Sequence, residues 1–484
     1  KVLILSCSTG EGHNSAAKAY LEYLQSQGIE AEVQDTMGLV SPEAKERSSE
    51  IYLFSTRTKL FAMAYRAGAA VSDALETSKS PVYYANKLYC DHLHDYIEQN
   101  GFDVVVCVHI FPAEAVTALK RKGKLTAKSV FVMTDYTCIP FMKDTELDYY
   151  IVPHEHLIEE CVKKGLPREK LHPFGIPVRS IFHQPAADKR EARGQCILDY
   201  GYMDADKKWF LIMSGSMGFG HIQDTVKEIL RKCGDSVEVI LVCGNNSELR
   251  ANLQKNFRHS DNVVALGFTD KIPTLMDACD VIFTKPGGLS STEAAAKRIP
   301  IIHTAPIPGC ETMNALFFHY HGLSYATTDI REQVRQALLL CEDPVRRSRM
   351  IAAQASNINP NTCRDITELL KSIFLNCLRF FSNILAGPIG TAPEAQNTPI
   401  GVADISLRGL ESPQDGEQTH LVSILDDEYN AENALLFGFL LYLHRISCTY
   451  RRQNVSLLIE IPNEAVYAIN EITNRFVKCN FICT

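Results

Sequence analysis

The 484-residue sequence lacks the patterns that mark several classes of protein. Its 16 cysteines stand singly, without a C-x-x-C pair, which favours free thiols in a reducing compartment over a zinc site or a disulfide framework. No run reaches the roughly 18 to 20 apolar residues of a transmembrane helix, and no signal-peptide pattern follows Lys1. The net charge of −8 at pH 7 gives no general attraction for nucleic acid. We therefore predict a cytoplasmic protein that does not bind nucleic acid.

Phosphate-transfer motifs are missing as well. No P-loop of the form G-x-x-x-x-G-K-[ST] occurs, and the Asp-x-Asp at 204–206 does not follow a strand pattern. Because magnesium-dependent phosphoryl transfer lacks its usual parts, we expect neither a metal nor another cofactor. With 46% hydrophobic and 22% charged residues, a chain of this length predicts two or three folded domains.

A pattern of strand, glycine loop and helix occurs twice in the chain. Residues 2–6 form an apolar run that leads to Gly10, Gly12 and His13, and an amphipathic stretch follows. Residues 210–221 repeat the pattern. Short apolar strands alternate with helical patterns after each copy, which predicts two doubly wound parallel sheets. Further strands are expected over 102–108, 129–133, 237–242, 263–266, 281–284 and 299–302, with a helix over 113–121.

Composition and periodicity divide the chain into five segments. The two α/β domains cover 1–178 and 209–385, and the charged, Pro-containing stretch 179–208 joins them. The second domain ends in an amphipathic helix over 366–385. A Pro- and Gly-rich linker is expected over 386–418, and a small α/β appendage of unknown role over 419–484. Its expected elements are strands 421–425, 455–461 and 476–483 and helices 431–445 and 464–475.

Gly10, Gly12 and His13 lie where a strand pattern ends and a helix pattern begins. Backbone N–H groups and the helix dipole at such a point can hold an anion or a polar ligand group, and glycine permits close approach. His13 also suits a general base near neutral pH. The G-x-G-H spacing lacks the third glycine of a dinucleotide fingerprint, so a tight turn with a capping histidine is the alternative.

A second loop of this kind spans residues 285–294. Two glycines and two serines at a helix N-terminus suit a nucleotide diphosphate, and a glutamate one turn later suits a ribose diol. These residues are Gly287, Gly288, Ser290, Ser291 and Glu293. Glu311 and Asn314 follow another strand end and should face the same crevice, where they could hold sugar hydroxyls. Ordinary helix-start residues are the alternative for both loops.

Several motifs together resemble the family of monogalactosyldiacylglycerol synthases and processive diacylglycerol glucosyltransferases. They are G-E-G-H at 10–13, T-D-Y at 134–136, G-I-P at 175–177, K-P-G-G-L-S-S-T-E-A at 285–294 and P-I-P-G-C-E-T-M-N-A at 306–315. The motifs occur in family order and at family spacing.

The resemblance covers roughly residues 1–375. It implies a GT-B fold, in which two Rossmann-like domains face a cleft that holds a UDP-sugar. The N-terminal domain would take the acceptor and the second domain the donor. The implied reaction moves a hexose from UDP-glucose or UDP-galactose to diacylglycerol with inversion, and so makes a membrane glycolipid.

Carried over onto the matching positions, the resemblance also implies roles for the candidate residues. On the acceptor side, His13 and Asp135 are the two candidates for the base that takes the proton of the acceptor hydroxyl, beside the loop glycines Gly10 and Gly12. The implied donor residues are Glu293 for the ribose, Phe268 for the uracil, Gly287, Gly288, Ser290 and Ser291 for the diphosphate, Glu311 and Asn314 for the sugar, and Gly215, Ser216 and Gly218 along the cleft.

The sequence departs from the family pattern in three places. Cys310 stands where many members have Gln beside the sugar, which leaves the choice between glucose and galactose as the donor sugar open. The stretch after Asp135 lacks the His of many relatives, so the resemblance leaves the shape of the acceptor pocket open. No family counterpart matches the tail after about residue 386.

Residues 51–71 mix large apolar side chains with Arg57, Lys59 and Arg66, which suits an anionic membrane surface as well as an ordinary amphipathic core helix. We therefore expect a peripheral enzyme on the inner face of the cell membrane. The alternatives are transfer to another lipid, a UDP-sugar epimerase, and a non-catalytic lipid or nucleotide sensor.

Overall fold

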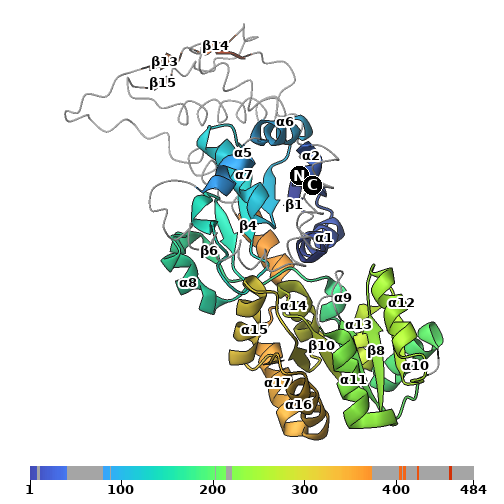
Figure 1. The fold of residues 1–484 in the computed structure, drawn as a ribbon. Coiled ribbons are helices and arrows are strands. Elements are labelled where there is room, and N and C mark those ends of the chain that lie inside the picture. The colour runs from blue at the N-terminus through green and yellow to red at the C-terminus, as the bar shows by residue number, and fades with distance from the viewer. Residues whose placement is uncertain are drawn as a thin grey trace. The chain divides into compact units, whose positions relative to one another are not determined.

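The computed structural model describes residues 1–7, 11–40, 80–87, 89–201, 203–213 and 221–372, together with four short strands between 403 and 459. The chain divides into two compact units, Lys1–Glu368 and Leu369–Thr484. The first unit holds two parallel six-stranded sheets, each in its own lobe (Figure 1).

The first sheet has the strand order β2-β1-β3-β4-β5-β6. Its strands are β1 (Val2–Ser6), β2 (Ala31–Asp35), β3 (Val104–Cys107), β4 (Lys128–Val132), β5 (Tyr149–Ile151) and β6 (Leu171–His172). The helices around it are α1 (Glu11–Ser26), α2 (Thr36–Val40), α5 (Pro81–Lys87), α6 (Cys90–Asn100), α7 (Ile110–Arg121) and α8 (Ile158–Lys163), with short 3-10 turns η1 (Met142–Asp144), η2 (Glu155–Leu157) and η3 (Arg168–Lys170).

The second sheet has the order β12-β11-β10-β7-β8-β9. Its strands are β7 (Lys208–Met213), β8 (Val237–Val242), β9 (Val263–Leu266), β10 (Val281–Thr284), β11 (Ile301–His303) and β12 (Tyr325–Ala326). The helices are α9 (Ser180–His183), α10 (Lys189–Tyr200), α11 (Ile222–Cys233), α12 (Ser247–Asn256), α13 (Ile272–Ala278), α14 (Gly288–Ala296), α15 (Cys310–Tyr320), α16 (Ile330–Glu342) and α17 (Pro344–Asn357), with the 3-10 turn η4 (Gly234–Ser236).

Burial explains why these segments form strands and helices. All four residues of β3 and all six of β8 are buried, because helices cover both faces of each sheet. On α1, Ala16, Tyr20 and Leu24 are buried at intervals of four residues, which places them on the one face that packs inward. The predicted pair of doubly wound domains is confirmed.

In each sheet the order in which the chain adds strands reverses once, and the two positions of reversal locate the expected site. In the first sheet the chain places β2 on one side of β1 and β3 on the other. In the second sheet β8 and β10 flank β7 in the same way. Open α/β sheets bind ligands outside the carboxyl ends of the strands at such reversals. The carboxyl ends of β1, β3, β7 and β10 are therefore where the site is expected.

The predicted linker 179–208 is not structureless, since it contains α9 and α10. Asp188 caps α10 by accepting from the N–H groups of Arg190 and Glu191. The buried Arg193 joins this helix to the second sheet, because its Nε donates to the Ala278 carbonyl and its Nη2 lies 2.8 Å from Asp280 Oδ2. The buried face of α10 is short and has Arg193 between Ala192 and Cys196, and the prediction did not recognise it as a helix.

The C-terminal segments are described in part. Residues 362–372 are helical, and the rest of the predicted helix 366–385 lies outside the described residues. Strands β15 (Val422–Ile424) and β16 (Leu457–Ile459) agree with two predicted strands, and they pair with β13 (Ala403–Ile405) and β14 (Leu407–Gly409) inside the predicted linker. The predicted helices 431–445 and 464–475 and the strand 476–483 lie outside the described residues. Over the described part of the chain, no helix is long and apolar enough to span a membrane.

Candidate active site

His13 is the third residue of α1 and follows the first strand of its sheet. Its Nδ1 lies 2.9 Å from the Val108 carbonyl oxygen and 2.9 Å from Thr134 Oγ1. A carbonyl oxygen only accepts hydrogen bonds, so Nδ1 must carry the proton of the neutral ring. The unprotonated nitrogen is then Nε2. His13 therefore has the tautomer in which Nε2 can accept a proton from a substrate.

The surroundings of His13 keep its ring neutral. Burial lowers its pKa below 6.5, and the Asp135 carboxylate and the bond to Val108 oppose that shift without reversing it. His109 lies edge-on to His13 at 4.7 Å between ring centroids, and burial also lowers the pKa of His109 well below its usual value. Neutral imidazole is the form that a general base needs, so this environment is compatible with the predicted role of His13.

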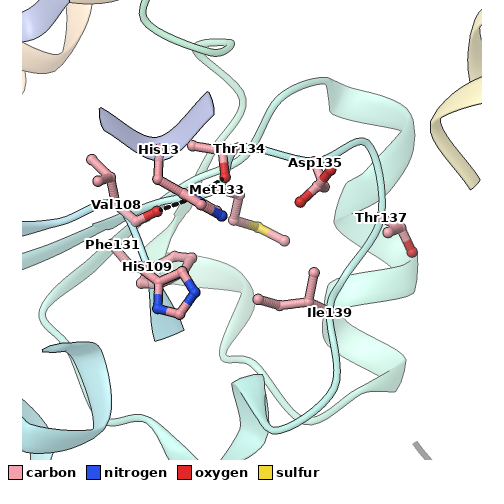
Figure 2. Close-up of a pocket in the computed structure, with 9 residues that line it drawn as sticks. All are labelled: His13, Val108, His109, Phe131, Met133, Thr134, Asp135, Thr137 and Ile139. Carbon is pink, nitrogen blue, oxygen red and sulfur yellow. Dashed lines mark hydrogen bonds between the residues drawn. The ribbon is translucent and has the colours of Figure 1, made fainter. Parts of the chain in front are cut away.

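A small pocket opens beside these residues. It is lined by His13, Val108, His109, Phe131, Met133, Thr134, Asp135, Thr137 and Ile139. Figure 2 shows His13 reaching this pocket from one side and Asp135 from the loop after β4. The two candidate bases therefore share one pocket, with apolar walls from Phe131, Met133 and Ile139.

Asp135 is also tied to the second lobe. Its Oδ1 accepts a hydrogen bond of 2.8 Å from Asn314 Nδ2, and the neighbouring Tyr136 N–H donates to Asn314 Oδ1 at 2.6 Å. The Tyr136 ring stacks on Phe317, and its hydroxyl lies 2.9 Å from Thr292 Oγ1. The T-D-Y segment is thus one of the places where the first lobe contacts the second.

The first turn of α14 is where the anion cradle is predicted. Gly287 caps the helix, and the first backbone bond of this turn runs from the Ser291 N–H to the Gly287 carbonyl. The preceding N–H groups are the unpaired donors of a helix start, which attract anions. A Cβ on Gly288 would lie 2.0 Å from the Thr134 carbonyl oxygen, so glycine is required where the two lobes meet. Ser290 is partly exposed on this turn.

Ser291 does not face the donor side, contrary to the prediction. Its side chain is fully buried, and its hydroxyl lies 2.9 Å from His303 Nε2. Ser324 holds the other ring nitrogen of His303 at 3.0 Å, and burial lowers the pKa of His303 to about 3. This part of the expected cradle belongs to the core of the second lobe.

Glu293 lies one turn further along α14, which packs against α1 and α9. Burial raises the pKa of its carboxyl to about 8, although the charge of Arg179 acts in the opposite direction. Arg179 itself donates to Glu22 at 3.0 Å. Within the described residues the Glu293 carboxyl makes no hydrogen bond, so its oxygens are free to accept from a ligand diol.

Glu311 holds two groups of its own lobe. Its Oε1 lies 2.6 Å from Lys285 Nζ, and its Oε2 accepts from the Ile307 N–H at 2.8 Å. The ion pair is largely shielded, with 18% and 13% of the side chains exposed. Glu311 therefore fixes the loop between β11 and α15 beside the cradle.

The other predicted residues are placed as follows. Gly12 lies in α1, where the two lobes approach each other. A Cβ added to Gly12 would lie 4.0 Å from the Cβ of Leu289. Phe268 is 75% exposed after β9, as a stacking surface for a base would be. Gly10, Gly215, Ser216 and Gly218 lie outside the described residues.

Comparisons with known proteins agree with this geometry. Residues 13–178 match the monogalactosyldiacylglycerol (MGDG) synthase family, and residues 204–356 match the glycosyl transferases group 1 family. The chain carries both glycosyltransferase domains. The resemblance inferred from its motifs is confirmed.

Its curated relatives include processive diacylglycerol beta-glucosyltransferases of Bacillus. Those of Bacillus mycoides (strain KBAB4) and Bacillus cereus (strain G9842) are each 28% identical over 376 and 375 residues. Each match covers 76% of this chain and 93% of the relative.

Solved structures of glycosyltransferases and epimerases share the fold of these domains. MurG of Acinetobacter baumannii is 13% identical with a TM-score of 0.51, over 77% of this chain and 99% of that one. The UDP-GlcNAc 2-epimerase of Neisseria meningitidis, solved with UDP-GlcNAc, is 14% identical with a TM-score of 0.50 over the same shares. The GT-B fold is therefore confirmed.

The sequence analysis assigned no individual role to three residues of this candidate site. His109 and Thr134 directly follow the strand patterns that end near Val108 and Met133, and Lys285 follows β10. The rule that polar residues after parallel strands gather at one edge could have found all three. Their partners, in contrast, come from distant parts of the chain.

Proposed function

We propose that the protein transfers a hexose from a UDP-sugar to the free hydroxyl of diacylglycerol, with inversion at the anomeric carbon. The domains and relatives support glycosyl transfer, and the names of the Bacillus relatives supply diacylglycerol and glucose as the substrates to test. The proposal places this reaction on the inner face of the cell membrane. The basic and apolar segment 51–71, which motivates the membrane contact, lies outside the described residues.

The observation that carries the proposal is the tautomer of His13. Val108 and Thr134 engage Nδ1, so Nε2 is the nitrogen left to take a proton, and the cradle of α14 begins on the opposite lobe. We propose that His13 Nε2 takes the proton of the acceptor hydroxyl as its oxygen bonds to the anomeric carbon. Asp135 would steady the imidazolium that forms, since its charge favours the protonated ring.

On the donor side, the bond from the anomeric carbon to the UDP oxygen breaks and negative charge grows on the diphosphate. The N–H groups of the first turn of α14 are proposed to stabilise that charge. Glu293 would accept hydrogen bonds from the ribose, and Phe268 would stack on the uracil. No metal is required by this scheme.

UDP release tests the proposal. UDP-glucose and UDP-galactose would be offered separately to the full chain, with and without diacylglycerol in anionic vesicles, and any lipid product would be identified. We expect release that depends on diacylglycerol, a β-linked product and a clear preference for one donor.

Other outcomes would reject the proposal in distinct ways. Conversion of the donor without an acceptor would indicate an epimerase, and release dependent on another lipid would change the acceptor. UDP binding without turnover on any lipid would favour a sensor.

A further inference from the structure

The side chain of Asn314 crosses from the second lobe to the first. It lies in the first half of α15 and is fully buried. Its amide makes three hydrogen bonds: Oδ1 accepts from the Tyr136 N–H, and Nδ2 donates to Asp135 Oδ1 and to the Pro286 carbonyl. The amide of Asn314 therefore links Asp135 in the pocket, the backbone of Tyr136 and the loop that leads into α14.

This arrangement leaves the amide little capacity for a sugar. An Asn side chain has two donor hydrogens, and both are used here. Donation to a carboxylate is the stronger kind of hydrogen bond, and in a buried site its loss leaves the acceptor unsatisfied. The geometry therefore favours a role that acts through Asp135 rather than by direct contact with the donor.

We propose that Asn314 is a positioning residue: it fixes the Asp135 carboxylate beside His13 and ties that carboxylate to the loop before α14. The inference rests on the proposed function, since it assumes that His13 and Asp135 serve glycosyl transfer. Its consequence is that the donor lobe sets the electrostatic environment of the base in the acceptor lobe.

Two variants separate this role from sugar binding. Asn314→Asp keeps an oxygen for the Tyr136 N–H but loses both donated bonds, and Asn314→Ala loses all three. We expect kcat to fall about 10-fold or more in both, with donor KM and UDP affinity within about 2-fold of the wild type. Met313→Ala is the matched control, because Met313 is the preceding residue of α15 and is 42% exposed. A raised donor KM with normal kcat would overturn the proposal.

A double variant tests whether Asn314 acts through Asp135. If it does, Asn314→Ala should change kcat by less than about 2-fold when Asp135→Ala is already present. Independent, multiplicative losses would contradict the inference. UDP binding by calorimetry shows that each variant is folded.

A second readout does not depend on turnover. If the wild type transfers no sugar, the proposed function fails, but the titration of His13 can still be followed by NMR in the full chain. Within the part of the chain that the structure describes, the charged and titratable groups beside that ring are His109 and Asp135. Asn314→Ala should move the His13 midpoint by about 0.3 units or more, and Met313→Ala should not. A midpoint that moves in Asp135→Ala but not in Asn314→Ala would refute the inference.

Discussion

The two sheets place very different chemistry at their points of reversal. Beside the first sheet, His13 and His109 are neutral rings held by a backbone carbonyl, a hydroxyl and each other. Beside the second sheet, a helix start, the Lys285–Glu311 ion pair and a carboxyl of raised pKa prevail. The same fold thus provides a proton acceptor at one reversal and a site for an anion at the other.

Burial shifts the protonation of the site residues in opposite directions in the two lobes. For histidine, burial lowers the pKa and favours the neutral base, whereas for Glu293 it raises the pKa and favours the neutral acid. The first effect prepares a group for reaction. The second leaves a neutral carboxyl whose oxygen can accept a hydrogen bond from a ligand.

The largest expected effect comes from removing the proton acceptor. His13→Ala should lower turnover by about 10² to 10⁴-fold, because Nε2 is the proposed base, while UDP affinity changes little. Steady-state kinetics and UDP titration measure both quantities, and His92→Ala, an exposed position on α6, is the control. Near-normal turnover in His13→Ala would move the base role to Asp135.

The contact between the lobes should be nearly as sensitive. Gly288→Ala places a methyl group against the Thr134 carbonyl, so the lobes must shift apart. We expect turnover to fall by about 10²-fold and the free energy of unfolding to drop by about 1–3 kcal/mol. Gly194→Ala in α10 is the matched control, since an added Cβ there has nothing within 4 Å. Equal behaviour of the two variants would show that the close approach has no role.

Glu293 gives a prediction that depends on pH. Its pKa rises from 4.5 unfolded to about 8 folded, so its contribution to stability is complete below about pH 4.5 and is lost as the pH rises through 8. Glu293→Gln should not show this loss. The free energy of unfolding of the variant, relative to that of the wild type, should therefore be about 1–3 kcal/mol higher at pH 8 than at pH 5. The same variant should bind UDP more weakly, because an amide cannot ionise to become the stronger carboxylate acceptor when the ribose hydroxyls donate to it.

Denaturant unfolding at the two pH values measures the stability difference. Glu248→Gln, at an exposed position on α12, is the control and should leave the pH dependence unchanged. An unaltered pH dependence in Glu293→Gln would mean that this carboxyl is well solvated.

The two neighbouring serines of α14 offer a smaller effect. Ser291→Ala should reduce the free energy of unfolding by about 1–2 kcal/mol, because the buried His303 loses a partner, and should leave UDP affinity unchanged. Ser290→Ala should do the reverse, with weaker UDP binding and little change in stability. Thermal unfolding and UDP titration of both variants decide the matter, and weaker UDP binding in Ser291→Ala would restore its predicted role.

These serines also show how far the sequence could lead. The alternation of strands and helices predicts both sheets, since strands buried on two faces read as apolar runs such as 104–107. The loops after those strands are predictable for the same reason. Which of Ser290 and Ser291 faces the ligand is not, because it depends on the rotation of α14 and on His303, which comes later in the chain.

Two other features could not be predicted from the sequence, for related reasons. The hydrogen bonds that Arg193 of α10 makes to Ala278 and Asp280 join residues 85 and 87 positions apart. The hydrogen bond from Asn314 to Asp135 joins residues that are 179 positions apart in the sequence. Local patterns locate such polar residues near the site, but only the folded chain shows what they bind.

The smallest expected effect concerns metal ions, and it returns to the contrast between the lobes. If the first turn of α14 carries the charge of the departing diphosphate, its fixed N–H groups do the work that a divalent cation does elsewhere. A chelator should then change UDP affinity and turnover by less than about 2-fold, and added Mg²⁺ should not restore activity to Gly288→Ala. Calorimetry with UDP in chelator and in Mg²⁺ tests this directly. A strong dependence on the cation would show that the helix start alone does not balance the anion, and would shift attention to the partly exposed carboxylates beside it, Glu293 and Glu311.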